Sequence, residues 1–317
     1  MPDLWLVFEA TPRCNLECVF CYNVWLGKHS KPSELSLDDI EELFKRIRDD
    51  AHPTGVTITG GEPLLRADLP RMAETLRNLA LKVGLTTNGT LLDSKAARRL
   101  VSAGISHFEV SLPAATAETY TRLCGDNRLR RARDAIVAIA DTAVPASASI
   151  MVCRPNLEET GRAIELAFAL GARAAALNRF VPTGRGRKNA AQLSLSTEHL
   201  EKMLKQADSV AGRTGMAVYT GIPVEDCIVP HRQYPHVSFG PCHCGREKWA
   251  VDPSGNLRTC EQSPVILGNL MENSFTELSE SHPARRFRQN NLKPDCLACE
   301  SYPSCGGACR LLPPGRS

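Results

Sequence analysis

The chain has 317 residues, 43% of them hydrophobic, which is enough for a sizeable core and suggests two domains. A formal net charge of +3 gives no reason to expect binding to nucleic acid or to a membrane surface. The N-terminus lacks the features of a signal peptide and no apolar run is long enough to span a bilayer, so we expect a cytoplasmic protein.

Strand-like and helical segments alternate from the N-terminus to about residue 180. We expect strands at 4–10, 56–59, 83–87, 108–112, 147–153 and 175–180. Apolar side chains recur at helical spacing between them, which predicts helices at 37–47, 69–79, 94–103, 129–140 and 157–170. This alternation predicts an α/β fold with a parallel sheet and right-handed crossovers. Periodicity alone leaves a doubly wound sheet and a partial barrel equally open.

The character of the chain changes after a predicted helix at 196–211. From about residue 216 the sequence is rich in Cys, Pro, Gly and turn residues, as in a small domain organised by metal. We therefore predict two domains, 1–215 and 216–317. A basic loop precedes the last helix, and its Arg185, Arg187 and Lys188 are compatible with an acidic substrate or leader peptide, although a solvated loop is the simpler interpretation.

The thirteen cysteines are unevenly distributed: three lie at 14–21 and seven at 242–309. In a reducing cytosol such groups indicate metal ligands rather than disulfides. Cys124 and Cys153 have no cysteine nearby in the sequence and are interpreted as buried apolar residues.

The first group, Cys14, Cys18 and Cys21, is a C-x3-C-x2-C motif directly after the first predicted strand. Ligands and catalytic groups gather in such loops, at the carboxyl ends of parallel strands. Three thiolates can ligate three irons of a [4Fe–4S] cluster and leave the fourth iron open to a cofactor or substrate. A zinc site with a remote fourth ligand, or three unrelated cysteines, are the alternatives.

This motif resembles that of the radical S-adenosylmethionine superfamily, and the resemblance continues along the chain. A Gly-Gly-Glu-Pro segment ends the second strand, where the family has a motif that contacts the methionyl amino group. A Thr-Asn-Gly segment ends the third strand and resembles a ribose-contacting segment. Each fits an ordinary turn by itself, but together they occur in the family's order. The resemblance implies these cofactor contacts: Phe20, Gly60, Gly61, Glu62, Thr87, Asn88 and Ser111.

The C-terminal cysteines form a C-x2-C-x5-C-x3-C array preceded by a G-x4-C segment. Together they resemble the SPASM domain, a module that binds auxiliary iron–sulfur clusters, although the array alone also fits a zinc ribbon. The resemblance implies one or two auxiliary [4Fe–4S] clusters. The first would use Cys242, Cys260 and Cys309 with either Cys244 or Cys227, and the second would use Cys296, Cys299 and Cys305.

The fourth ligand of that second cluster is not predicted, because no cysteine follows Cys309 before Ser317. An open iron, a non-cysteine ligand or water, and an absent or labile cluster are the alternatives that remain.

The resemblance implies a partial (β/α)6 TIM-like barrel followed by a small Cys-rich iron–sulfur domain. The implied activity is reductive cleavage of S-adenosylmethionine to a 5′-deoxyadenosyl radical, which abstracts a hydrogen atom from the substrate. A flavodoxin or ferredoxin would supply the electron. Catalytic side chains are not predicted.

The substrate is predicted with less detail. Post-translational modification of a peptide is the first hypothesis. The chain has no room for a leader-binding domain, so we expect a separate leader-binding protein or, as the alternative, a small-molecule substrate in cofactor or natural-product biosynthesis. A non-enzymatic iron–sulfur or zinc protein is the distant alternative.

Overall fold

A computed structural model describes residues 3–25 and 32–312. Its strands form one eleven-stranded sheet in the order β11-β10-β9-β1-β2-β3-β4-β5-β6-β7-β8. Strands β1 to β8 are parallel to their neighbours, as predicted for the first six. The strands are β1 (Trp5–Thr11), β2 (Gly55–Gly60), β3 (Lys82–Thr87), β4 (Ile105–Ser111), β5 (Ala146–Val152), β6 (Ala174–Arg179), β7 (Ala217–Thr220), β8 (Val237–Ser238), β9 (Lys248–Val251), β10 (Asn256–Arg258) and β11 (Gly268–Asn269).

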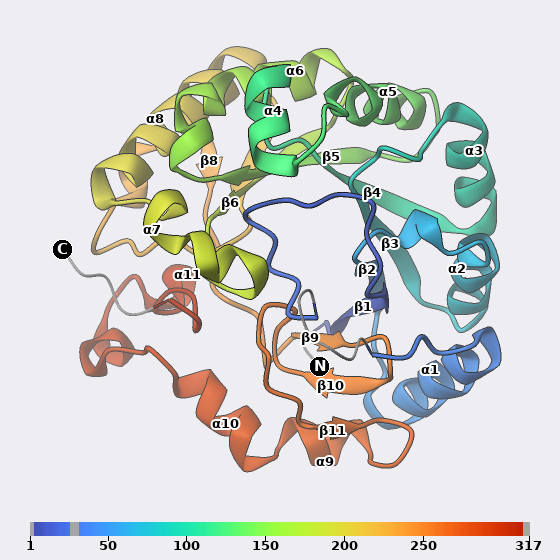
Figure 1. The fold of residues 1–317 in the computed structure, drawn as a ribbon. Helices are drawn as coiled ribbons and strands as arrows, with labels where there is room; N and C mark the ends of the chain where they lie inside the picture. Colours follow the sequence, from blue (N-terminus) through green and yellow to red (C-terminus); the bar gives the residue numbers. More distant parts are fainter. Residues whose placement is uncertain (1–2, 26–31, 313–317) are drawn as a thin grey trace.

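Helices surround the curved sheet on its outer side (Figure 1). This arrangement confirms the α/β partial barrel and excludes a doubly wound sheet, which would carry helices on both faces. The α-helices are α1 (Leu37–Ala51), α2 (Leu69–Asn78), α3 (Ser94–Ala103), α4 (Ala117–Cys124), α5 (Leu129–Ala140), α6 (Thr160–Ala169), α7 (Ala190–Leu193), α8 (Thr197–Thr214), α9 (Phe275–Ser279), α10 (His282–Gln289) and α11 (Tyr302–Cys305). Short 3-10 turns are η1 (Pro63–Leu65), η2 (Arg154–Glu159), η3 (Gly184–Asn189), η4 (His231–Gln233) and η5 (Pro294–Ala298).

Helix α1 illustrates how local sequence sets these elements. Ser36 accepts a hydrogen bond from the Asp39 amide at 3.1 Å, and the Asp39 carboxylate accepts one from the Ser36 amide at 3.2 Å. This reciprocal cap satisfies amide groups that the first turn leaves unpaired. Ile40, Leu43 and Phe44 then share the face that packs in the core. The predicted helix is therefore confirmed.

The C-terminal region returns to the first strand of the barrel. Strand β9 pairs in parallel with β1, and β10 and β11 add antiparallel strands beyond it (Figure 1). A buried ion pair between Glu9 on β1 and Arg258 on β10 joins the two regions, both side chains being at most 1% exposed. The sheet thus runs across the predicted domain boundary at residue 216.

Several elements of the barrel region were not predicted. Strands β7 and β8 are four and two residues long, too short for a clear alternating pattern. Helices α4 and α7 are eight and four residues long, in segments for which no element was predicted. Among the helices of the described residues, none combines the length and hydrophobicity that a membrane span requires.

Candidate active site

A large cavity opens at the carboxyl ends of the barrel strands. Its wall includes Gly60 at the end of β2, Thr87 at the end of β3 and Ser111 at the end of β4. Residues of the C-terminal region also line it, Lys248 and Glu261 among them. The cavity therefore lies between the ends of the barrel strands and the C-terminal region.

The cysteine motif lies in the loop after β1, and all three of its cysteines line this cavity. The loop is fixed by backbone hydrogen bonds from Val19 N to Leu123 O (2.9 Å) and from Gly186 N to Cys21 O (3.0 Å). Burial raises the pKa of Cys14, and it raises that of Cys21 to about 12. These thiols are therefore protonated at neutral pH, and a metal cluster must displace their protons when it binds.

The three sulfurs of the motif are not arranged for a single zinc ion. Four thiolates around one tetrahedral zinc lie about 3.8 Å apart, because each Zn–S bond is about 2.3 Å long. Within the described part of the chain, the sulfurs of Cys14, Cys18 and Cys21 do not all lie within 4.8 Å of one another.

Arg185 was interpreted from the sequence as a solvated residue, but it is partly buried next to this motif. Its charge acts on Cys18 and Cys21 and favours their thiolate forms. Gly186 lets the loop of Arg185 lie close to the cysteine motif, because a Cβ at this position would lie 3.0 Å from the Phe20 carbonyl oxygen. Phe20 itself lines the cavity, as predicted for a cofactor contact.

Glu62 is fully buried immediately behind the cavity wall. Its carboxylate accepts hydrogen bonds from Leu64 N (3.0 Å), Thr87 Oγ1 (2.7 Å) and Asn88 N (2.8 Å). Burial raises the pKa of Glu62, and none of the described lysines, arginines or histidines forms an ion pair with it.

A buried carboxylate without a counter-charge is unfavourable, so an ammonium group nearby would stabilise it. A carboxylate can accept about four hydrogen bonds, and three are used here. This site therefore fits the amino group of S-adenosylmethionine.

Two glycines place this segment against the cysteine loop. Gly60 has φ +132°, and a Cβ on Gly61 would lie 2.0 Å from the Arg13 carbonyl oxygen. Asn88 connects the next strand end to the same loop, since its Nδ2 donates to Asn15 Oδ1 at 2.9 Å. The predicted cofactor contacts thus meet around one cavity, with the Glu62 side chain behind the wall rather than on it.

The same cavity carries polar residues that the sequence analysis missed. Burial raises the pKa of Glu109 and raises that of Tyr219 to about 12. Lys248 donates a hydrogen bond to Glu261 at 2.8 Å, and both line the cavity. Glu109 lies on β4. An acidic residue at an inward-facing position of a barrel strand was the signal in the sequence that could have indicated this part of the site.

A first group of C-terminal cysteines lies directly behind Glu261. The ligand atoms of Cys244, Cys260 and Glu261 all lie within 4.8 Å of one another. The Cys242 thiol hydrogen-bonds to Cys244, and this contact together with burial raises the pKa of Cys242. Burial, with Cys242 nearby, raises the pKa of Cys309 to about 11. The structure therefore groups Cys244, rather than Cys227, with Cys242, Cys260 and Cys309.

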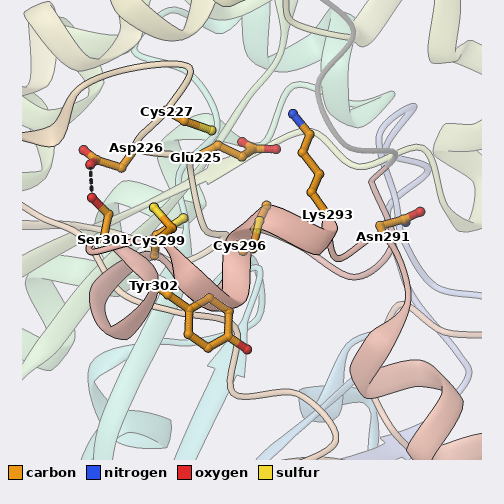
Figure 2. A pocket seen from close by; sticks show the side chains of 12 residues that line it. Glu225, Asp226, Cys227, Asn291, Lys293, Cys296, Cys299, Ser301 and Tyr302 are labelled. Carbon is orange, nitrogen blue, oxygen red and sulfur yellow. Dashed lines mark hydrogen bonds between the residues drawn. The ribbon is translucent and has the colours of Figure 1, made fainter.

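The remaining C-terminal cysteines, Cys296, Cys299 and Cys305, line a separate small pocket (Figure 2). Cys227 lines the same pocket, although its loop lies far from these residues in the sequence. The C-terminal cysteines thus lie in two groups, with Cys244 in one and Cys227 in the other.

Comparisons with known proteins agree with this arrangement. The Radical SAM superfamily model matches residues 8–167, and an iron-sulfur cluster-binding domain model, SPASM, matches residues 242–300. The chain is 30% identical to the AdoMet-dependent heme synthase of Methanosarcina barkeri, over 96% of this chain and 90% of that protein. It is 28% identical to the PqqA peptide cyclase of Granulibacter bethesdensis, over 98% of this chain and 83% of that protein.

A solved structure with the same fold is that of Streptococcus suis SuiB bound to its precursor peptide SuiA. It has a TM-score of 0.75 at 16% identity, covering 97% of this chain and 72% of that one. The family match spans half of the chain, and the three motifs that carry the resemblance to this superfamily meet at one cavity. The chain belongs to the radical SAM superfamily, as an enzyme with a C-terminal SPASM iron–sulfur domain.

Proposed function

We propose that this radical SAM enzyme modifies a peptide, removing a hydrogen atom from one of its residues. The observation that supports this proposal is a charged pair, Lys248 and Glu261, which lines the same cavity as the proposed cofactor contacts. Such a pair offers both a donor and acceptors to the amide groups of a peptide. The similarity to a peptide cyclase over 98% of this chain supports the same substrate class.

In this proposal Cys14, Cys18 and Cys21 hold the catalytic [4Fe–4S] cluster, and Glu62 receives the amino group of S-adenosylmethionine. When bound, these groups supply a 5′-deoxyadenosyl radical that takes the substrate hydrogen atom. The protein orients them: Glu62 fixes the amide of Asn88 directly after β3, and Asn88 Nδ2, which donates one hydrogen to Asn15, has a second hydrogen for the ribose. Phe20, Gly60, Gly61, Thr87 and Ser111 form the rest of the proposed cofactor wall.

The part of the cavity that is lined by Glu109, Tyr219, Lys248 and Glu261 is the proposed substrate side. Lys248 and Glu261 form a charged pair that can orient a peptide group through hydrogen bonds. Glu261 is also placed to accept a proton from a bound substrate. Cys242, Cys244, Cys260 and Cys309 lie immediately behind, which supports a first auxiliary cluster in electronic contact with the substrate.

Further parts of the proposal concern partners and domains. We propose an external one-electron donor of the flavodoxin or ferredoxin type, a separate leader-binding protein, and a division into a core (1–215) and an auxiliary-cluster domain (216–317). A small-molecule substrate is the second candidate, favoured by the 30% identity to a heme synthase.

Deuterium transfer can distinguish the two substrate classes. The enzyme, reconstituted anaerobically with iron and sulfide, is mixed with S-adenosylmethionine, dithionite and either the peptide or the small-molecule fraction of cells grown in heavy water. We expect deuterium in 5′-deoxyadenosine with the peptide fraction. Deuterium only with the small-molecule fraction would refute peptide modification. The control is the Cys14→Ala, Cys18→Ala, Cys21→Ala variant, which should release no 5′-deoxyadenosine.

A further inference from the structure

Four cysteines from two distant segments line the second C-terminal pocket. Cys227 belongs to the loop that follows β7, whereas Cys296, Cys299 and Cys305 lie on η5, α11 and the turn between them. Figure 2 shows the Cys227 side chain on its own loop, across the pocket from Cys296 and Cys299. We propose that Cys227 is the fourth thiolate of the second auxiliary [4Fe–4S] cluster, so that no iron of this cluster is open to a substrate.

The loop of Cys227 is fixed at this place by residues next to it in the sequence. Glu225 forms a buried ion pair with Arg179 at the end of β6, at 2.8 Å. Asp226 accepts a hydrogen bond from Ser301 at 2.5 Å, shown in Figure 2, and one from the His231 amide at 2.7 Å. One contact ties the loop to the barrel and another ties it to the cysteine-rich segment. Cys227 is therefore held at the pocket by contacts on both sides.

The backbone excludes Cys309 from this pocket, although it follows Cys305 closely in the sequence. Gly306, Gly307 and Ala308 have φ values of +62°, +70° and +75°. Three successive residues in the left-handed region reverse the chain direction, which is rare for a residue such as alanine. The turn directs Cys305 to the second pocket and Cys309 to Cys242. Cys227 is thus the remaining cysteine positioned to complete the set.

Lys293 lines the pocket together with Glu225 and Asp226, and Figure 2 shows its side chain extending toward the side where Cys227 and Glu225 lie. Glu225 and Asp226 are paired with Arg179 and Ser301, so Lys293 supplies a positive charge for the thiolates. Among the described residues, no three of the four sulfurs all lie within 4.8 Å of one another, so the pocket is not preformed for one tetrahedral zinc ion.

A complete set of thiolates changes what this cluster can do. An open iron can bind a substrate, whereas a cluster with four protein ligands can only gain or lose electrons. Cys227 and Cys299 are both exposed, so this cluster would lie at the protein surface. We therefore assign it to electron exchange with a partner. This inference rests on the proposed presence of auxiliary clusters, but not on the peptide substrate.

The test uses the full-length Cys14→Ala, Cys18→Ala, Cys21→Ala protein as background, because it lacks the catalytic cluster. After anaerobic reconstitution it should hold about eight irons, four for each auxiliary cluster. Adding Cys227→Ala removes the thiolate from one iron, so we expect a changed EPR spectrum of the reduced second cluster and an iron content between about seven and eight. The matched control, Cys153→Ala, should keep all eight, since Cys153 is a buried core residue. Eight irons and an unchanged spectrum in the Cys227→Ala variant would overturn the proposal.

A second measurement does not depend on the folding of a variant. Wild-type protein is alkylated before and after reconstitution, and the modified cysteines are identified by mass spectrometry. Cys227 is exposed without a cluster, so we expect it to react in the apoprotein and to be protected after reconstitution. Equal labelling in both states would refute ligation. If the background variant holds only about four irons, the second cluster is absent and the inference fails, while 5′-deoxyadenosine release by the wild type still supports the proposed function.

Discussion

Replacing Glu62 with glutamine should weaken binding of S-adenosylmethionine without weakening the fold. The variant keeps the size of the side chain and removes its charge. A hydrogen bond to a charged group contributes about 1.5–3 kcal/mol, which corresponds to a loss of about 10- to 150-fold in affinity.

Stability should change little. Burial raises the pKa of Glu62, so the folded apoprotein holds its proton more tightly than the unfolded chain does. Stability therefore falls as the pH rises from the ordinary pKa of a glutamate to the raised pKa of the folded state. Glutamine removes that loss, but its NH2 group cannot accept the hydrogen bond that one carboxylate oxygen accepts from Asn88 N. Because these two effects oppose each other, we expect the apo variant to unfold at a similar temperature at neutral pH. Glu62→Ala instead leaves three buried donors unpaired, each at a cost of about 1–3 kcal/mol.

Equilibrium dialysis of the reconstituted protein measures the affinity, and iron content and thermal unfolding are measured on the same samples. Glu159→Gln is the control: Glu159 also accepts hydrogen bonds from a loop, Thr116 included, but from none of the predicted cofactor contacts. It should leave the affinity unchanged. If Glu62→Gln binds S-adenosylmethionine as tightly as the wild type, Glu62 does not pair with the amino group and its proposed role is wrong.

Two further predictions concern how the site is supported. Gly61→Ala should lower the iron content by about four per chain, because its Cβ would lie 2.0 Å from the Arg13 carbonyl oxygen and displace the cysteine loop. Gly240→Ala, with open space around it, is the control, and equal iron in both would contradict the argument. Arg258→Met should destabilise the protein by about 3–5 kcal/mol in chemical denaturation, since it leaves Glu9 buried without its ion-pair partner. A second change, Glu9→Gln, should restore part of this stability, and no recovery would count against the ion pair as the cause.

The catalytic half of the site was predictable because parallel strands bring their carboxyl ends together. Gly60, Thr87 and Ser111 end successive strands, so strand order in the sequence already implies that they meet. The cysteine motif after β1 then belongs to the same edge. No long-range contact had to be known for this part, which explains why local patterns were sufficient.

The auxiliary half depends on contacts between distant segments. Lys248 and Glu261 reach the cavity only because β9 pairs with β1, and a four-residue strand gives no signal of its partner. Cys227 has no sequence spacing that assigns it to either cluster, since its position depends on the contacts of Glu225 and Asp226. The sequence could not predict the positions of residues that depend on contacts between distant segments.

The turn between Cys305 and Cys309 sets the order of the three proposed cluster sites. Four residues of chain span at most about 14 Å, so these two cysteines keep the auxiliary groups adjacent. Glu261 and Lys248 lie between the first group and the cavity. The sites then follow one another from the cavity, through Cys242 and its neighbours, to the exposed Cys227. With Cys227 as a ligand, the proposed catalytic cluster in the cavity keeps an iron without a protein ligand. The proposed second auxiliary cluster at the surface has a thiolate on every iron. That order suits a substrate at one end and an electron carrier at the other, because only the cavity needs a free coordination position.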